Sequence, residues 1–193
     1  FAILATDAPN LSQITSTKNM FSHATSLDSS LININHWDVS TITNMESMFL
    51  YSHINSPINN WDVSNVTNMK SMFSNNPGFN QPLNNWDVSN VTDMSYMMSG
   101  TNVFNQPLNA WDTSSVTDMS GLFKESDAFN QPLNSWNTSK VTNMNSMFYK
   151  TKQFNRDISM WDVRNVTIMN SMFYNSQKFN SPLNGWELGN VSL

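Results

Sequence analysis

The chain contains no cysteine among its 193 residues, and charged side chains are scarce. Without thiols, neither a disulfide framework nor a thiolate metal site can form. Aspartate, glutamate, lysine and arginine make up 12% of the residues, and the net charge is −5 at pH 7 with no cluster of basic residues. Binding of a phosphate backbone depends on such clusters. The composition therefore argues against nucleic acid as a partner.

Long apolar runs are lacking as well. No run approaches the roughly 20 apolar residues that span a bilayer, and residues 1–4 are too short for the core of a signal peptide. We predict that this segment does not insert into a membrane. Because the chain starts with Phe1 and stops eight residues into a repeat, we expect it to be a processed or truncated piece of a longer protein.

Signatures of catalysis are also missing. The three histidines, His23, His36 and His53, fall in different registers of the repeat described below. A histidine-centred site would need partners that this repeat does not place beside them. The sequence has no glycine-rich phosphate loop, no Gly-x-Ser-x-Gly and no His-Glu-x-x-His. We therefore predict a protein that is not an enzyme and has no catalytic residues and no cofactor.

What the chain has in abundance is a repeat. Its seven tryptophans are 24 residues apart once and 25 residues apart thereafter: Trp37, Trp61, Trp86, Trp111, Trp136, Trp161 and Trp186. Such a period is typical of solenoids. Positions are counted from these tryptophans below, so that +1 is the next residue. We predict an N-terminal segment with a degenerate first coil (1–36), six regular repeats (37–185) and the start of a further, truncated coil (186–193).

The apolar positions within each coil predict its fold. Pro-Leu-Asn-x-Trp-Asp-Val combines alternation with β-forming residues and predicts a short strand, whereas Thr-Asn-Met-x-x-Met-Phe spaces apolar residues as one helical turn does. The expected fold is an α/β solenoid of about seven coils, with a parallel β-sheet on one face and short helical turns on the other. Asparagines at +19 and +23 should hydrogen-bond along the stack.

The repeat resembles a known family in W-D-V-S-N-V-T-N-M-x-x-M-F-x-x-x-x-x-F-N-Q-P-L-N-x. It is similar to the BspA-like repeats, also found as mycoplasma-type surface lipoprotein repeats and as a domain of unknown function, over nearly the whole chain. The resemblance implies a leucine-rich-repeat-like fold in surface-exposed proteins associated with adhesion or host contact. Relatives often carry alanine or cysteine at +15, where this chain has serine, threonine or asparagine, so a role for that cysteine does not carry over.

An aspartate follows the tryptophan in five coils: Asp38, Asp62, Asp87, Asp112 and Asp162. Stacked carboxylates repel each other by roughly 1 kcal/mol even in water. A row of calcium ions could offset this repulsion, since calcium prefers oxygen ligands. Alternatively, each carboxylate accepts backbone N–H groups in the turn that follows. Asn137 at the same position keeps the acceptor without the charge, which favours the turn.

A threonine at +6 precedes the expected helical turn in each coil: Thr43, Thr67, Thr92, Thr117, Thr142 and Thr167. A hydroxyl there is typical of a helix N-cap. A flat row of outward-facing threonines would instead suit binding to ice or to a crystalline polysaccharide. Sequons recur at +4, with two more matches at other positions, and predict glycans if the protein is secreted by a eukaryote: Asn10, Asn65, Asn90, Asn137, Asn165 and Asn190.

Residues that differ between coils are free to bind a partner, because stacking does not determine them. One such set lies before the second phenylalanine of the coil and another at +20, and together they predict a binding surface: Gln81, Gln106, Gln131, Arg156, Tyr149, Lys152, Tyr174 and Lys178. We predict an extracellular module, or one at a cell or virion surface, that recognises a protein or glycan. The alternative is a structural component whose coil ends stack on neighbouring copies to build a fibre or coat.

Overall fold

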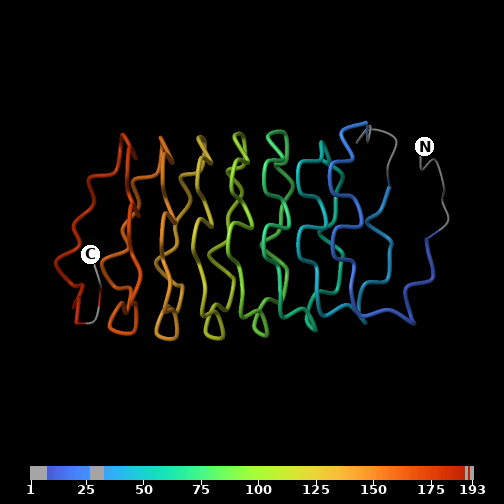
Figure 1. Cartoon of the computed structure of the whole chain (residues 1–193), viewed down its shortest axis with the longest axis horizontal. Helices are drawn as coiled ribbons and strands as arrows, with labels where there is room; N and C mark the ends of the chain where they lie inside the picture. The colour runs from blue at the N-terminus through green and yellow to red at the C-terminus, as the bar shows by residue number, and fades with distance from the viewer. Residues whose placement is uncertain (1–7, 27–32, 190, 192–193) are drawn as a thin grey trace.

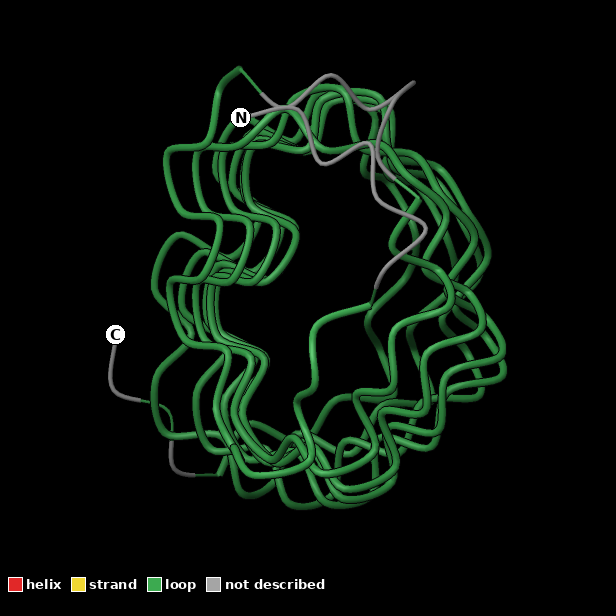
Figure 2. Ribbon diagram, turned by 90° about the vertical axis from the view of Figure 1, so that its right-hand side faces the viewer, coloured by secondary structure: helices red, strands yellow, loops and turns green. Residues whose placement is uncertain are grey.

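The computed structural model describes residues 8–26, 33–189 and 191 and shows a stack of coils. Successive coils lie side by side along the long axis, from the blue end of the chain to the red end (Figure 1). Viewed along the stack, the coils lie behind one another as irregular rings (Figure 2). Parts of the predicted N-terminal segment and of the last coil lie outside the described residues.

Within these described ranges the chain forms no helix and no extended strand. The predicted α/β solenoid, with a leucine-rich-repeat-like parallel sheet and helical turns, is therefore wrong. Pairing of the sheet type is confined to isolated parallel bridges between neighbouring coils, which join one residue per coil: Ser16, Asn44, Asn68, Asp93, Asp118, Asn143 and Ile168.

The segment predicted to be helical is a series of tight turns. The N–H of Met48 donates to the carbonyl of Met45, and that of Ser52 donates to the carbonyl of Phe49, both at 3.2 Å. Ser47 and Tyr51, the third residues of these turns, have φ values of 56° and 53°. Type II turns require a positive φ there, whereas a right-handed helix excludes it. Turns of this length bury nearly the same positions as a helix. The spacing of the apolar residues therefore predicted a helix where the chain forms turns.

Alternate N–H groups of this segment point along the stack. Met45 donates to the carbonyl of Asn68 at 2.9 Å, and Ser47 donates to that of Lys70 at 2.8 Å. Buried backbone groups need such partners. Each coil therefore satisfies its backbone partly through its own turns and partly through the next coil.

The segment predicted to be a strand turns as well. The N–H of Trp61 donates to the carbonyl of Ile58 within the same turn, at 3.2 Å. The link to the preceding coil is made by the side chain, because Nε1 of Trp61 donates to the carbonyl of Ile34 at 2.7 Å. Equivalent indole bonds of 2.9–3.1 Å recur in five further coils, from Trp86, Trp111, Trp136, Trp161 and Trp186.

The core is a set of stacked aromatic columns. Phe79, Phe104 and Phe129 follow one another with ring centroids 6.0 and 6.1 Å apart. Trp61 and Trp86 are 6.5 Å apart and nearly parallel. These rings are 0–3% exposed, and most of the other apolar side chains that recur once per coil are buried in the same way. The core therefore runs the length of the regular coils.

Candidate functional site

Side chains at +19 and +20 tie each coil to the one before it. Oδ1 of Asn80 accepts the backbone N–H of Asn105 at 3.0 Å, and Nε2 of Gln106 donates to the carbonyl of Asn80 at 3.2 Å. Arg156 donates in the same way through Nε to the carbonyl of Asn130, at 2.8 Å. The predicted contacts at this position, Gln81, Gln106, Gln131 and Arg156, are therefore engaged in stacking.

The aspartates at +1 shape the turn that follows them. Oδ1 of Asp38 accepts the backbone N–H of Ser40 at 3.0 Å and its hydroxyl at 2.6 Å. Asn137 accepts the N–H of Ser139 at 3.0 Å without any charge. The same backbone bond occurs at Asp62, Asp87, Asp112 and Asp162. No group of three or more acidic or histidine side chains that could hold a metal ion gathers in the part of the chain that the structure describes.

The turn bonds predict how stability depends on pH. The side-chain bond from Arg164 is the largest cause that lowers the pKa of Asp162, to about 2, and bonds from Ser40 lower the pKa of Asp38. A carboxyl group whose pKa is lower in the folded state stabilises the fold above its unfolded pKa of about 3.9 and loses this contribution as pH falls. We expect the free energy of unfolding to fall between about pH 4 and about pH 2.

Asp162→Asn is the matched variant, because asparagine keeps the acceptor, as Asn137 does. Wild type should exceed this variant in stability near neutral pH, and the difference should shrink as pH falls toward the lowered pKa of Asp162. Urea denaturation at a series of pH values measures both. A gap that stays constant down to about pH 2 would contradict this origin of the acid sensitivity.

The threonines at +6 form an exposed row whose hydroxyls are bonded along the stack. Oγ1 of Thr92 donates to the carbonyl of Thr67, and Oγ1 of Thr117 donates to that of Thr92, at 3.2 and 3.1 Å. They do not cap helices, because none follows them in the described chain. The N-cap prediction is wrong. Binding to ice or to polysaccharide through this row remains a prediction.

The sequon asparagines have two structural roles. Nδ2 of Asn65, Asn90 and Asn165 donates to a carbonyl of the preceding coil at 2.7–2.9 Å. Asn10 and Asn137 accept N–H groups in their own turns. All five are exposed, and the predicted site at Asn190 lies outside the described residues.

Residues that vary between coils meet in a groove of about 390 Å³ along one edge of the stack. This edge groove is lined by residues at +14 and +16 of four successive coils: Asn75, Gly100, Glu125, Lys150, Pro77, Asn102, Asp127 and Lys152. Lys152 belongs to the predicted binding surface. The neutral half of the groove was not predicted, although its residues occupy the same +14 and +16 positions as those of the charged half.

The charged half of the edge groove is internally paired. Nζ of Lys152 lies 2.7 Å from Oδ2 of Asp127, and Nζ of Lys150 lies 3.5 Å from Oε1 of Glu125. All four side chains remain 32–48% exposed, so solvent screens these pairs. The two ion pairs place ammonium donors and carboxylate acceptors at the surface of the groove.

A pair of tyrosines lies at +13, next to the lysine end of the edge groove. The rings of Tyr149 and Tyr174 stack with centroids 5.1 Å apart. The ammonium groups of Lys124 and Lys150 lie 5.3 and 5.2 Å from the centre of the Tyr149 ring. Tyr174 is 60% exposed, and Lys178 is exposed nearby in the sequence.

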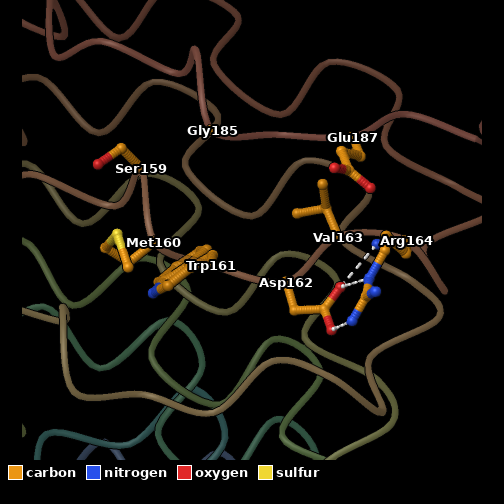
Figure 3. Close-up of a pocket in the computed structure, with 8 residues that line it drawn as sticks. All are labelled: Ser159, Met160, Trp161, Asp162, Val163, Arg164, Gly185 and Glu187. Carbon is orange, nitrogen blue, oxygen red and sulfur yellow. Dashed lines mark hydrogen bonds and ion pairs between the residues drawn. The ribbon is translucent and has the colours of Figure 1, made fainter.

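A second hollow of about 270 Å³ lies beside Trp161, between the last two coils (Figure 3). Arg164 makes a bidentate pair with Asp162 on its wall, with Nε and Nη2 2.9 and 2.7 Å from the two carboxylate oxygens. Met160 on the opposite side is 83% exposed. Arg164 and Asp162 bind each other in this hollow, so it is a weaker candidate than the edge groove.

Comparison with known proteins identifies a family. The described residues include no helix long and apolar enough to cross a membrane. No match to a curated protein was found, and no solved structure matches either. A family model described as "Mycoplasma protein of unknown function, DUF285" matches residues 3–111 and again residues 100–193. These matches together cover nearly the whole chain, which therefore belongs to the DUF285 family.

Proposed function

We propose that this chain is a non-enzymatic recognition module that binds a protein or glycan partner in the edge groove. The observation that carries the proposal is that repeated positions and variable positions of the coil have different roles. Repeated residues at 0, +1, +6 and +19 are used for turns and for stacking. The edge groove is lined by residues that differ from coil to coil, so its chemistry can be adapted to a partner without loss of the stack.

The resemblance to BspA-like surface repeats supports a place for this function outside the cell, or at a cell or virion surface, and a role in adhesion. Membership of a repeat family is consistent with this proposal, since stacked repeats build extended binding surfaces.

The test is binding of the purified chain to protein and glycan arrays, with a groove variant and a control. Asn102→Ala, Asp127→Ala and Lys152→Ala together remove three groove side chains at +16. The control combines Asn85→Ala, Lys140→Ala and Gln177→Ala, which are exposed and lie outside the groove. We expect the groove variant to lose at least about tenfold in affinity and the control to bind as wild type does.

Equal binding by both variants would refute the groove as the binding site. A native mass that rises with protein concentration, without any array partner, would favour the predicted assembly into a fibre or coat instead. Both variants are first compared with wild type by urea denaturation, so that a loss of binding is not a loss of folding.

A further inference from the structure

The charges in the edge groove cancel. Glu125 and Asp127 lie in one coil and Lys150 and Lys152 in the next, and each carboxylate is paired with one ammonium group. Two negative and two positive side chains leave no net charge to attract a polyanion or a polycation. A net charge on the ligand would therefore add little to its affinity for this groove.

The groove still offers many hydrogen-bonding groups. Asn75 and Asn102 add amides to the carboxylates and ammonium groups. The backbone N–H groups at +14 are already used, as in Gly100, which donates to the carbonyl of Lys124 at 2.7 Å. The +14 backbone N–H groups are therefore not free to bind a ligand, and the side chains of the lining include both donors and acceptors. Hydroxyl groups both donate and accept, so a polyhydroxylated ligand matches such a lining.

A glycine keeps the neutral half of the groove open. Gly100 has a φ of 70°, and a Cβ at this position would lie 3.0 Å from Oδ1 of Asn75. Any side chain there would crowd the wall formed by Asn75. Nδ2 of Asn75 donates to the hydroxyl of Ser74 at 3.1 Å, which helps to hold the amide in place.

The tyrosine pair supplies an apolar surface beside the polar lining. Tyr174 is 60% exposed and stacks on Tyr149, whose coil also contributes Lys150 and Lys152. Tyrosine combines an apolar ring with a polar hydroxyl, and the C–H face of a sugar packs on such a ring. The polar side chains that can bind hydroxyl groups therefore lie beside an apolar surface formed by the tyrosine pair.

The direction and size of the groove suit an extended oligosaccharide. Its two columns follow the stack across four coils, and phenylalanine rings of neighbouring coils are 6.0–6.1 Å apart. One pyranose unit of an extended oligosaccharide has a similar length. A volume of about 390 Å³ falls within the range of small-ligand sites.

We infer that the edge groove binds a neutral oligosaccharide chain that lies along the stack axis. This inference rests on the proposed recognition function and names the class of its ligand. Asn75 and Asn102 contact hydroxyls in the neutral half, the two ion pairs contact hydroxyls in the charged half, and the tyrosine pair packs against a sugar face.

Calorimetric titration with short linear neutral oligosaccharides tests the inference, using glucose and N-acetylglucosamine oligomers, with oligogalacturonides as the charged comparison. We expect a neutral oligomer to bind with an affinity that is unchanged from about 50 to about 500 mM salt. Asn102→Ala should weaken this binding by about tenfold. Asn85→Ala is the matched control, because it removes an exposed asparagine side chain outside the groove.

Three results would overturn the inference: no binding of any neutral oligomer, binding only of the charged oligomers with strong salt dependence, or neutral binding that Asn102→Ala leaves unchanged. Suppose that no neutral oligomer binds, that a protein on the array does bind, and that the groove variant does not bind this protein. Only the carbohydrate inference then fails. If neither class of ligand binds, the recognition function fails as well.

Discussion

Replacing Phe104 by alanine is expected to lower the free energy of unfolding by about 3–5 kcal/mol. Phe104 is fully buried between Phe79 and Phe129, with ring centroids 6.0 and 6.1 Å away. Alanine loses the transfer free energy of the ring and leaves a cavity between two stacked aromatics. Neighbouring coils are tied together by backbone and indole bonds, so they cannot move closer to fill this cavity.

The adjacent residue provides the control for this substitution. Val103 is 48% exposed, and Val103→Ala should change the stability by no more than about 0.5 kcal/mol. Urea denaturation followed by tryptophan fluorescence measures both variants. A loss below about 1 kcal/mol for Phe104→Ala would show that the phenylalanine column is not close-packed.

Replacing Gly121 by serine is expected to destabilise the chain by about 2–3 kcal/mol. Gly121 has a φ of 59°, and a Cβ there would collide with Cδ1 and Cε1 of the Tyr96 ring in the preceding coil. Serine occupies this +10 position at positive φ in four other coils: Ser47, Ser71, Ser146 and Ser171. The backbone therefore tolerates serine, and most of the cost should come from contact with the tyrosine.

A double-mutant cycle separates the two contributions. Removing the ring in the double variant Tyr96→Ser/Gly121→Ser restores the pair of small residues seen between other coils. This variant should regain about 1–2 kcal/mol relative to Gly121→Ser alone. Strict additivity of the two single substitutions would mean that the collision is relieved by a small shift of the ring and that positive φ accounts for the whole cost.

The helix and strand predictions failed because their signals are local and the hydrogen bonds are not. Met45 and Met48 have the spacing of a helix. The Met48 N–H, however, donates to the carbonyl of Met45, three residues back, rather than four residues back as in an α-helix. The acceptor of the Met45 N–H lies in Asn68 of the next coil, and no local pattern reveals a partner at that distance in the sequence. The indole of Trp61 links coils where a strand would have used its backbone.

The candidate site was found in part. Variation between coils pointed to the stretch that includes Lys152, but it also pointed to Gln81 and Arg156, which are used for stacking. Periodicity cannot separate a side chain that faces a partner from one that bonds the preceding coil, because both recur once per coil. Gly100 and Asn102 were missed although they occupy the same +14 and +16 positions as Lys150 and Lys152.

The amino-acid sequence by itself determined the period of the stack and most of the residues that face its core, because apolar side chains that recur once per coil are buried together whether turns or helices carry them. It also specified the Asp38 type of turn, since that bond spans two residues. Only the tertiary structure decided the backbone conformation and the edge groove. Positive φ values and hydrogen bonds between coils arise from stacking, and the groove exists because Glu125, Lys150 and their neighbours from four coils are aligned in space.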